Sequence, residues 1–419
     1  MKLVVVGAGS TYSPELVEGL GRLRDRVPVD ELVLQDTDPE RLAVVGAAAE
    51  RIARAHGFAG RLIRTGDLDR AVDGADVVVI QIRVGGQAAR HLDETLPLAC
   101  GCVGQETTGA GGFAKALRTV PVVLDIAGRV RQRAAPNAWI IDFTNPVGII
   151  TRALLDHGHR AIGLCNVAIG FQRLFAGWLG VAPEEVELGH AGLNHLTWVR
   201  SVTVDGEDCL PEILRTRGDE LADQVELPRR LLDLLQAVPS YYLRYYYRHD
   251  AVVEELRHSR SRAEEVSDIE KQLIEIYRDP QLRDKPELLM RRGGAYYSEA
   301  ALQLLSSLVD GAGDTHVVNV RNHGAVPGLP DDTVVEIPAT IDRDGAHPLP
   351  VAPLGAHQLG LVSHVAAYER LAVEAAVSGD RDVALQALMT HPLIGQLDRA
   401  ERLLDDLLAA HRQLLPAFA

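Results

Sequence analysis

The first ten residues read MKLVVVGAGS (residues 1–10), and this stretch decides how the chain begins to fold. Residues 3–6 are a run of Leu and Val, which favours a buried strand. Gly7 and Gly9 follow the run directly and allow a tight turn, and Ser10 begins a more polar segment. A strand that leads through a glycine turn into a helix is the first unit of an α/β fold.

The alternation of strands and helices continues outward from this unit to about residue 165. Further apolar runs, which predict strands, lie at residues 31–35, 76–82, 138–143 and 161–165. Helical patterns separate them, and the clearest is PERLAVVGAAAERIARA at residues 39–55. Near-continuous Val, Ile and Leu runs are typical of parallel strands that helices cover on both faces. The predicted fold class is therefore α/β, with an N-terminal Rossmann-type, doubly wound parallel sheet over residues 1–190.

From about residue 190 the pattern changes. Residues 195–210 alternate in polarity and contain Asp205-Gly206, a turn signal, so they predict an antiparallel hairpin. The later elements expected are helices at 221–235 and 262–277, strands within 319–340, and a mostly helical tail from 355. The sequence has no internal repeat and no low-complexity linker. We therefore expect a C-terminal α+β domain over residues 191–419, packed closely on the first domain, for substrate binding and oligomerisation.

Composition narrows the class of protein. The chain has 419 residues and a net charge of −15, and an acidic balance disfavours nucleic acid and anionic membranes as partners. No apolar run reaches the length of a membrane span, and the first run is too short for a signal peptide. The four cysteines do not form the pattern of a disulfide framework, so we expect a cytoplasmic protein.

The glycine turn at residues 7–10 predicts a dinucleotide site. Its glycines permit close approach of a pyrophosphate, and amides at the start of the next helix face the negative charge. Tyr12 stands where the usual third glycine would be. Asp36 ends the second predicted strand, where a carboxylate binds the adenosine ribose hydroxyls and favours NAD over its 2′-phosphorylated form. The alternative for Asp36 is a solvated loop acid beside Asp38 and Glu40.

Several later segments, taken in order, resemble one family. They are GAGSTYSPEL (7–16), RVGG (83–86) with Arg90, Asp93 and Glu94, GQETTG (104–109) with GGF (111–113) and ALRT (116–119), TNP (144–146), GLCNV (163–167), GLNHL (192–196), PSYYLRYYY (239–247) and RGGAYYS (292–298). Together they resemble glycoside hydrolase family 4, the NAD- and metal-dependent glycosidases. The pair Cys165-Asn166 and the RGGAYYS segment look like the 6-phospho-β-glucosidase branch, although Ala168 replaces the proline usual there.

This resemblance implies a redox route to hydrolysis, in place of the two-carboxylate scheme of most glycosidases. NAD+ takes hydride from C3 of the sugar, which makes the proton on C2 acidic. A base removes that proton, the aglycone leaves C1 by elimination, water adds, and the steps reverse. The implied substrate is a 6-phospho-β-glucoside, and the implied cofactors are NAD and Mn2+ or another divalent metal.

The resemblance assigns the metal to Cys165 and His195. Two protein ligands leave coordination positions for sugar and water. Cys165 ends a predicted parallel strand, at the edge where open α/β sheets bind ligands. From residue types alone, a thiolate and an imidazole also suit zinc or copper. Without the family, a small buried strand residue and a core histidine are the simpler interpretations.

The resemblance points to Tyr242 as the base, with Tyr241 as its rival. A free tyrosine has a pKa of about 10, so a nearby metal or cation must favour the phenolate. The remaining tyrosines of residues 239–247 are expected to pack as an aromatic helix face.

Other residues receive binding roles. Ser10, Thr11 and Arg83 are assigned to the cofactor together with the glycine turn. Arg90 is the first candidate for the sugar phosphate, because guanidinium binds phosphate bidentately, and Arg292 is the second. The alternative for Arg90 is a salt bridge with Asp93 or Glu94.

Three polar residues are assigned to the sugar. Asn166 is expected to bind a hydroxyl, and Asn145 to bind sugar hydroxyls or nicotinamide. The alternative for Asn145 is a simple Asn-Pro turn. Glu106 is expected to bind hydroxyls or orient a water, or alternatively to cap its Gly/Thr-rich loop.

Other functions stay open from the sequence. One is a family member that acts on α-linked or non-phosphorylated glycosides. Another is a conventional NAD-dependent 2-hydroxy acid dehydrogenase, which shares the Rossmann start but needs no Cys165–His195 metal pair. The third is a non-enzymatic nucleotide sensor. The family also implies a homodimer or homotetramer.

Overall fold

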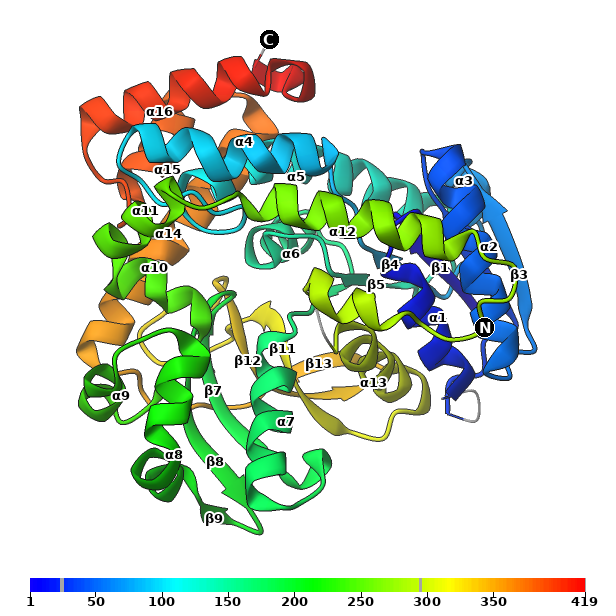
Figure 1. The fold of residues 1–419 in the computed structure, drawn as a ribbon, viewed down its shortest axis with the longest axis horizontal. Coiled ribbons are helices and arrows are strands. Elements are labelled where there is room, and N and C mark those ends of the chain that lie inside the picture. The colour runs from blue at the N-terminus through cyan, green and yellow to red at the C-terminus, as the bar shows by residue number, and fades with distance from the viewer. Residues whose placement is uncertain (23–25, 294–295, 419) are drawn as a thin grey trace.

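A nine-stranded sheet organises the computed structural model, which describes residues 1–22, 26–293 and 296–418 (Figure 1). Its strand order is β13-β12-β11-β6-β5-β4-β1-β2-β3. The strands are β1 (Lys2–Val6), β2 (Glu31–Gln35), β3 (Arg61–Thr65), β4 (Val77–Ile80), β5 (Trp139–Asp142), β6 (Ala161–Gly163), β11 (Asp314–Arg321), β12 (Val334–Asp342) and β13 (Gly345–Pro348). Strands β1 to β6 are parallel, which confirms the predicted Rossmann-type sheet.

The parallel half forms where the apolar runs predicted it. Leu3, Val4 and Val5 of β1 are completely buried, because β1 lies between β2 and β4 and helices cover both faces. Helix α2 (Pro39–Ala55) has the predicted bounds, and the Asp38 side chain caps its first amides. Strand β3 was not predicted, since it is an edge strand whose charged Arg61 and Arg64 hide its alternation.

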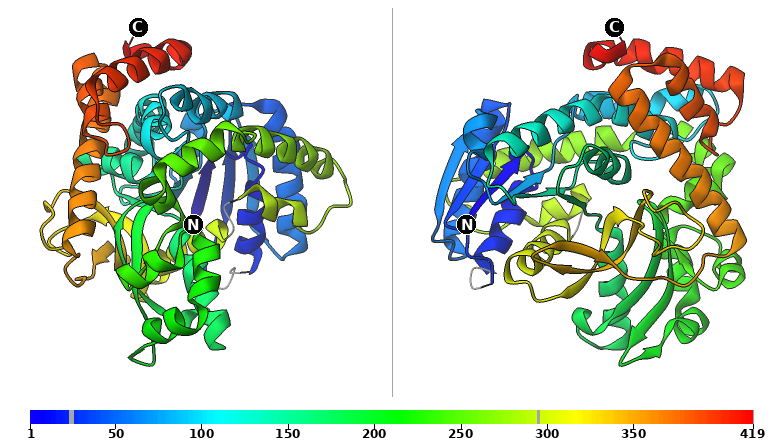
Figure 2. Two further views of the ribbon diagram at one scale, coloured as in Figure 1. Left: turned by 60° about the vertical axis from the view of Figure 1, so that its left-hand side comes forward. Right: turned by 180° about the vertical axis from the view of Figure 1, so that it is seen from behind.

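The remaining helices cover this sheet and extend the molecule. They are α1 (Ser13–Arg22), α3 (Leu68–Val72), α4 (Gly86–Ala99), α5 (Gly109–Arg133), α6 (Val147–Asp156), α7 (Val167–Leu179), α8 (Leu210–Val225), α9 (Arg229–Leu235), α10 (Arg244–Tyr247), α11 (His249–Arg257), α12 (Arg262–Tyr277), α13 (Tyr297–Asp310), α14 (Ala356–Ser378), α15 (Arg381–Thr390) and α16 (Leu397–Ala410). Helices α4, α5 and α12 run side by side (Figure 1), and α14 to α16 confirm the predicted helical tail (Figure 2).

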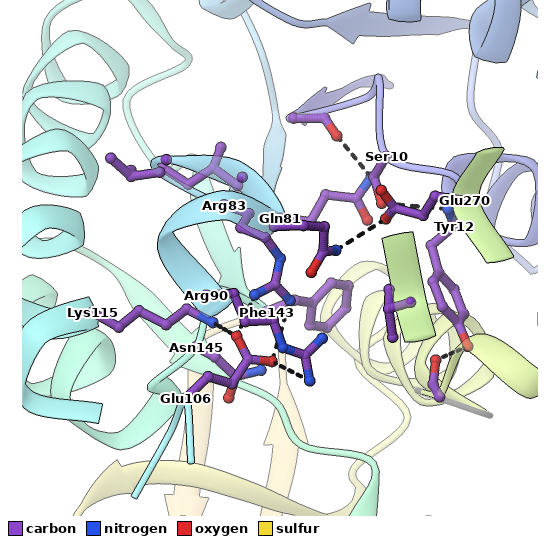
Figure 3. A pocket seen from close by; sticks show the side chains of 18 of the residues that line it. Ser10, Tyr12, Gln81, Arg83, Arg90, Glu106, Lys115, Phe143, Asn145 and Glu270 are labelled. Atoms are coloured by element: carbon purple, nitrogen blue, oxygen red, sulfur yellow. Dashed lines mark hydrogen bonds and ion pairs between the residues drawn. The ribbon is translucent and has the colours of Figure 1, made fainter. Parts of the chain in front are cut away.

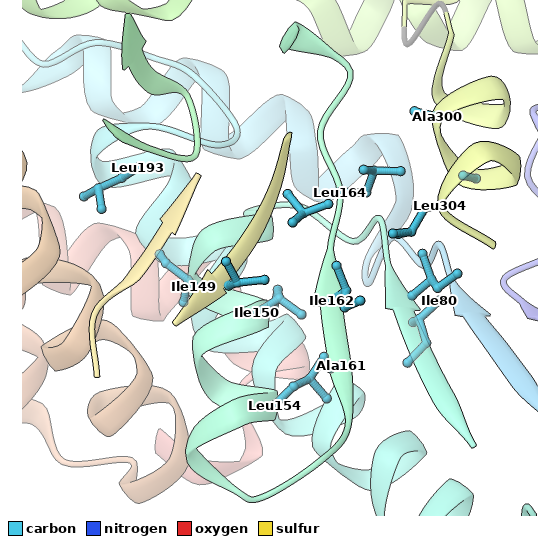
Figure 4. Close-up of a cluster of buried hydrophobic side chains, with 14 of the residues drawn as sticks. Ile80, Ile149, Ile150, Leu154, Ala161, Ile162, Leu164, Leu193, Ala300 and Leu304 are labelled. Carbon is cyan, nitrogen blue, oxygen red and sulfur yellow. The ribbon is translucent and has the colours of Figure 1, made fainter. Parts of the chain in front are cut away.

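The C-terminal half joins the same sheet. Asn319 of β11 pairs antiparallel with Gly163 of β6, so β11, β12 and β13 continue the sheet that the N-terminal half begins. Apolar side chains of β4, β6, α6 and α13 fill the space at this junction, among them Ile80, Ile162, Ile150 and Leu304 (Figure 4). The two halves therefore share a core, and the expected boundary at residues 190 and 191 stays a prediction.

A smaller sheet carries the turn on which His195 lies. It contains β7 (Glu187–Leu193), β8 (Leu196–Val204), β9 (Glu207–Asp208) and β10 (Val238–Pro239). The predicted hairpin over 195–210 exists as β8 and β9, joined at Asp205-Gly206, but β9 has only two residues. The main partner of β8 is β7, which was not predicted, and residues 194–195 form the turn between them.

One helix prediction needs correction. Residues 221–235 were expected to be one helix, but the chain breaks between α8 and α9. Glu226 takes a left-handed φ of 52°, and Pro228 follows, which cannot continue a helix interior. Helix α12, in contrast, has the predicted bounds and begins with a Ser261–Glu264 capping box.

Within the described part of the chain, no helix combines the length and the apolar character that crossing a membrane requires.

Candidate active site

A cavity of about 1600 Å³ lies beside the first glycine turn and the carboxyl ends of the parallel strands. It is lined by most of the residues that the sequence singled out, namely Gly7, Gly9, Ser10, Asp36, Arg83, Arg90, Glu106, Asn145, Asn166, Tyr241, Tyr242 and Arg292. Thr11, Cys165 and His195 are not among its lining residues. One cavity therefore joins the predicted cofactor turn to the predicted substrate residues.

The glycine turn is built for close approach. Gly7 has a φ of +88°, and a Cβ there would lie 2.7 Å from the backbone oxygen of Gln81. The amide of Gly9 donates to Asp36 Oδ2 at 2.7 Å, and the amide of Asp38 donates to Oδ1 at 2.9 Å. Asp36 is therefore fixed at the end of β2, beside the turn, where a ribose-binding carboxylate is expected.

Thr11 differs from the other residues of this turn. Its side chain is completely buried, and its carbonyl accepts a hydrogen bond from the Tyr277 hydroxyl at 2.7 Å. Tyr12 lines the cavity in its place, with the Arg292 guanidinium 4.9 Å above its ring. The segment that contains α12 thus packs directly on the glycine turn.

Arg292 is held by Glu270 of α12, at 2.8 and 3.1 Å. Burial opposes ionisation of Glu270, but Arg292 and Arg41 outweigh it, so the pKa of Glu270 is lowered. The predicted phosphate candidate Arg292 therefore lies beside the glycine turn with an anionic partner. Gly294 and Ala295 of its RGGAYYS segment lie outside the described residues.

Glu106 is the centre of a buried ionic cluster (Figure 3). Arg83 binds it, Lys115 Nζ lies 2.6 Å from Oε2, and Arg90 lies 3.2 Å from Oε1. Burial opposes its charge, but Arg83, Lys115 and Arg90 outweigh it, and the pKa of Glu106 is well below its usual range. Glu106 is therefore a carboxylate that orients two guanidinium groups and the Lys115 amine at the cavity wall.

Lys115 was missed by the sequence analysis. Its side chain is 2% exposed, and burial together with Arg83 lowers its pKa to about 7. The available signal was a single lysine in the otherwise apolar start of α5. A buried amine that titrates near neutral pH, beside a carboxylate and in a cavity, is typical of a functional site.

Arg90 makes the salt bridge that was weighed as its alternative role. Its Nε donates to Glu94 Oε1 at 2.7 Å. The neighbouring Asp93 instead binds Arg118 through both oxygens, at 2.5 and 2.8 Å. Arg90 keeps its place on the cavity wall, so both of its predicted roles are compatible with its position.

Cys165 lies two residues after the end of β6 and is almost completely buried. Its thiol interacts with the side chains of Asn194 and Tyr297, and burial and the charge of Glu336 raise its pKa. A thiolate in this place therefore needs a compensating positive charge. Tyr297, a further lining residue, was present in the RGGAYYS segment but was not singled out.

His195 has a buried, neutral imidazole. It lies on the turn between β7 and β8 with a left-handed φ of 64°, and burial lowers its pKa to about 4, so the imidazole is neutral. The Thr107 hydroxyl donates to Gln105 at 2.7 Å and lies 2.9 Å from His195 Nδ1. Because that hydroxyl proton is used, Nδ1 carries the imidazole proton and Nε2 keeps the lone pair.

These two side chains fit a divalent cation. A neutral imidazole with its lone pair on Nε2 is the ligand form of histidine, and a cation supplies the charge that a buried thiolate needs. Among the described residues, no group of three or more His, Cys, Asp or Glu side chains is arranged to hold a metal. The pair thus suits an open site with positions left for other ligands.

The two candidate tyrosines have different surroundings. The ring of Tyr242 stacks on His195, with centroids 3.5 Å apart, and burial and Cys165 raise its pKa. The hydroxyl of Tyr241 instead accepts a hydrogen bond from Arg244 at 2.9 Å, and burial also raises its pKa. Only Tyr242 is therefore stacked directly on a candidate metal ligand.

Asn145 offers an unused polar atom to the cavity. It lines the wall, and its Oδ1 is buried without a hydrogen-bond partner among the described residues. Because Asn145 also lines the cavity, this oxygen is available to accept a hydrogen bond from a ligand. Asn166 also lines the cavity, at the start of α7.

Comparisons with known proteins point to one family. The model of the family 4 glycosyl hydrolases matches residues 2–181, and that of the C-terminal domain of the same family matches residues 190–394. A Bacillus subtilis protein named a probable 6-phospho-beta-glucosidase is 40% identical, over 100% of this chain and 98% of its own.

Solved structures give the same result. The 6-phospho-beta glucosidase of Thermotoga maritima, solved with NAD and glucose-6-phosphate, superposes with a TM-score of 0.93 at 37% identity, over 99% of both chains. A structure of the Thermotoga protein with manganese, NAD+ and glucose-6-phosphate superposes with a TM-score of 0.91 at 36% identity, also over 99% of both chains.

Proposed function

Because this chain belongs to the family 4 glycosyl hydrolases, we propose that it hydrolyses 6-phospho-β-glucosides with NAD and a divalent metal. One observation carries the proposal. A single cavity connects the glycine turn and Asp36 with Tyr242, whose ring stacks on His195. A dehydrogenase needs the first part of this arrangement but not the second.

The residues around the glycine turn bind the cofactor. The helix start after Gly9 and Ser10 faces the pyrophosphate, and Asp36 receives the ribose hydroxyls. Arg83 extends this surface toward the sugar, because Glu106 holds its guanidinium at the cavity wall. Thr11 packs beneath the turn and does not bind the cofactor with its side chain, which is buried and does not line the cavity.

Cys165 and His195 hold the metal, for which Mn2+ is the expected ion. When bound, NAD supplies a hydride acceptor for C3 of the sugar, and the cation supplies an electrophile for the sugar oxygens. The Thr107 hydroxyl fixes the imidazole tautomer, and Asn194 orients the thiol. These contacts prepare the pair before any ligand arrives.

Tyr242 removes the C2 proton. Its phenol is buried and its pKa is raised in the chain alone, so it needs a neighbouring cation to ionise. Its place against His195 provides that neighbour when the metal is bound. Tyr241 lines the cavity beside it, and its hydroxyl already accepts a hydrogen bond from Arg244.

The sugar lies between the glycine turn and Tyr242. Asn145 and Asn166 bind its hydroxyls, and the Oδ1 of Asn145 accepts a hydrogen bond from one of them. Glu106 contributes by orienting the side chains of Arg83, Arg90 and Lys115 at the cavity wall. Arg90 is the first candidate for the 6-phosphate, and Arg292, held by Glu270, is the second.

The identities of the relatives favour a β-glucoside over an α-glucoside as the substrate of this chain. A phospho-alpha-glucosidase of Clostridium acetobutylicum is 30% identical, against 40% for the Bacillus subtilis protein. We also expect the enzyme to work in the cytoplasm as a homodimer or homotetramer, without nucleic-acid or membrane partners.

One assay tests the proposed function. The full-length protein is given nitrophenyl α- and β-glucosides, each with and without a 6-phosphate, and NAD+, Mn2+ and reductant are omitted in turn. We expect nitrophenol release only from the phosphorylated β-glucoside, and only with NAD+ and Mn2+ present. Release without NAD+, or net formation of NADH, would contradict the proposal.

A further inference from the structure

Glu336 of β12 is a buried acid at the point where the two sheets meet. Its side chain is 1% exposed. Its Oε1 is hydrogen-bonded to His190 Nε2 of β7 at 3.1 Å. Its Oε2 accepts hydrogen bonds from the side-chain amides of Asn194 at 2.8 Å and of Asn319 in β11 at 3.0 Å. One carboxylate thus connects β7, the β7–β8 turn, β11 and β12.

Glu336 is ionised in the folded protein. Burial opposes ionisation, but the hydrogen bond from His190 and the other donors outweigh it, and the pKa of Glu336 is lowered. A buried carboxylate is costly even when it is well bonded, and a hydrophobic replacement is often no less stable. Its presence here therefore calls for a role beyond holding the strands.

Asn194 links this carboxylate to the thiol of Cys165. Its amide nitrogen donates to Glu336, and its side chain also interacts with Cys165. Asn194 immediately precedes His195 on the same turn. The turn that presents the imidazole is therefore tied to the thiol and, through Asn194, to β12.

We propose that Glu336 is a positioning residue of the metal site, which fixes Asn194 against Cys165 and adds a negative charge near that thiol. The inference rests on the proposed function, since it takes Cys165 and His195 as the ligands. Among the described residues, Glu336 does not complete a group of three metal-binding side chains with Cys165 and His195. It acts through Asn194 and through its field in a poorly screened interior.

Electrostatics favours a divalent ion in this setting. A thiolate and the Glu336 carboxylate together carry two negative charges, which a single divalent cation balances. A neutral side chain at residue 336 would leave the bound ion with an excess positive charge in a buried place. Loss of such an outer carboxylate weakens metal binding by roughly 10- to 100-fold.

The test measures Mn2+ binding to the full-length, metal-free protein with NAD+ present, by the electron paramagnetic resonance signal of free Mn2+. Glu336→Gln should bind Mn2+ at least about tenfold more weakly, and Glu336→Asp should recover part of the loss. Glu369→Gln is the control, because Glu369 is a second buried acid of the same region, and burial together with the charge of Glu336 raises its pKa to about 8, so that it carries a proton at pH 7. It should bind Mn2+ as the native protein does. A loss below tenfold in Glu336→Gln, or an equal loss in Glu369→Gln, overturns the proposal.

A second pair of variants keeps the test valid if Glu336→Gln folds poorly. Asn194→Ala and Asn319→Ala each remove one donor to the same oxygen of Glu336, but only Asn194 interacts with Cys165. Asn194→Ala should weaken Mn2+ binding while Asn319→Ala does not. Equal effects would overturn the proposed route through Asn194. NAD+ binding and thermal unfolding of the metal-free variants show which proteins are folded.

Cys165→Ser distinguishes a failure of the proposed metal site from a failure of the proposed role of Glu336. If this variant binds Mn2+ as well as the native protein does, the metal site of the proposed function is wrong. If Cys165→Ser loses binding and Glu336→Gln keeps it, only the role of Glu336 is wrong.

Discussion

The imidazole of His195 and the phenol ring of Tyr242 lie face to face, with centroids 3.5 Å apart and planes within 6° of each other. Tyr242 comes from the η2 turn (Tyr241–Leu243), and His195 comes from the β7–β8 turn. A candidate metal ligand and a candidate base are therefore in direct contact. The contact explains how a cation at His195 would act on the phenol.

Exchange of the ligands tests the metal site. Cys165→Ser and His195→Ala should each abolish metal-dependent turnover, because each removes one of two protein donors. NAD+ binding, followed by quenching of protein fluorescence, should stay near the native value, since neither residue lines the cavity at the glycine turn. Native turnover in either variant would remove the metal assignment.

Tyr242→Phe tests the base against its rival. We expect kcat to fall roughly 100- to 10,000-fold, the usual contribution of a general base, while Mn2+ and NAD+ still bind. Tyr241→Phe is the matched control, because it removes the same hydroxyl from the adjacent ring, where it binds Arg244. A larger loss of kcat in Tyr241→Phe would exchange the two roles.

Glu106→Gln should destabilise the protein by about 3–5 kcal/mol, because it leaves buried cations without their carboxylate. Chemical denaturation gives the free energy of unfolding. Lys115→Met in the same background should restore part of it, since the ammonium is 2.6 Å from Glu106 and one unpaired charge is removed. Additive losses in the double variant would show that the two residues are not coupled.

Glu369 predicts a pH dependence of stability. Burial raises its folded pKa to about 8, so the native state holds a proton that the unfolded state releases above about 4.5. The stabilisation is fully present below about pH 4.5 and is lost as the pH rises to 8, by up to about 1.4 kcal/mol per unit.

The Glu369→Gln variant checks this sign, because its neutral amide does not titrate. The free energy of unfolding of the native protein, minus that of the variant, should fall between pH 5 and pH 8. A difference that is constant or rises over this range would contradict the assigned protonation of Glu369.

Much of the fold could be predicted because local patterns decide it. The Val-rich run before Gly7 and the capped helix at 39–55 depend on nearby residues alone. Strand β7 and the pairing of Asn319 with Gly163 could not be predicted, since they bring together segments far apart in the sequence. The break after α8 depends on a left-handed residue, Glu226, whose type does not require it.

The site was predictable to a similar extent. The glycine turn and Asp36 follow from strand and turn patterns, whereas Cys165 and His195 stand out only through the family resemblance. The burial of Thr11 and the pairing of Lys115 with Glu106 could not be predicted. Both depend on how α12 and α5 pack, which the local sequence does not report.

Deuterium exchange tests the central claim most directly, because it follows the proton that Tyr242 is proposed to remove. The enzyme cleaves a 6-phospho-β-glucoside in deuterium oxide with NAD+ and Mn2+, and NMR measures the isotope at C2 of the released glucose 6-phosphate. We predict deuterium at C2 in the product of the native enzyme. Cleavage at the native rate with hydrogen fully retained at C2 would contradict the account.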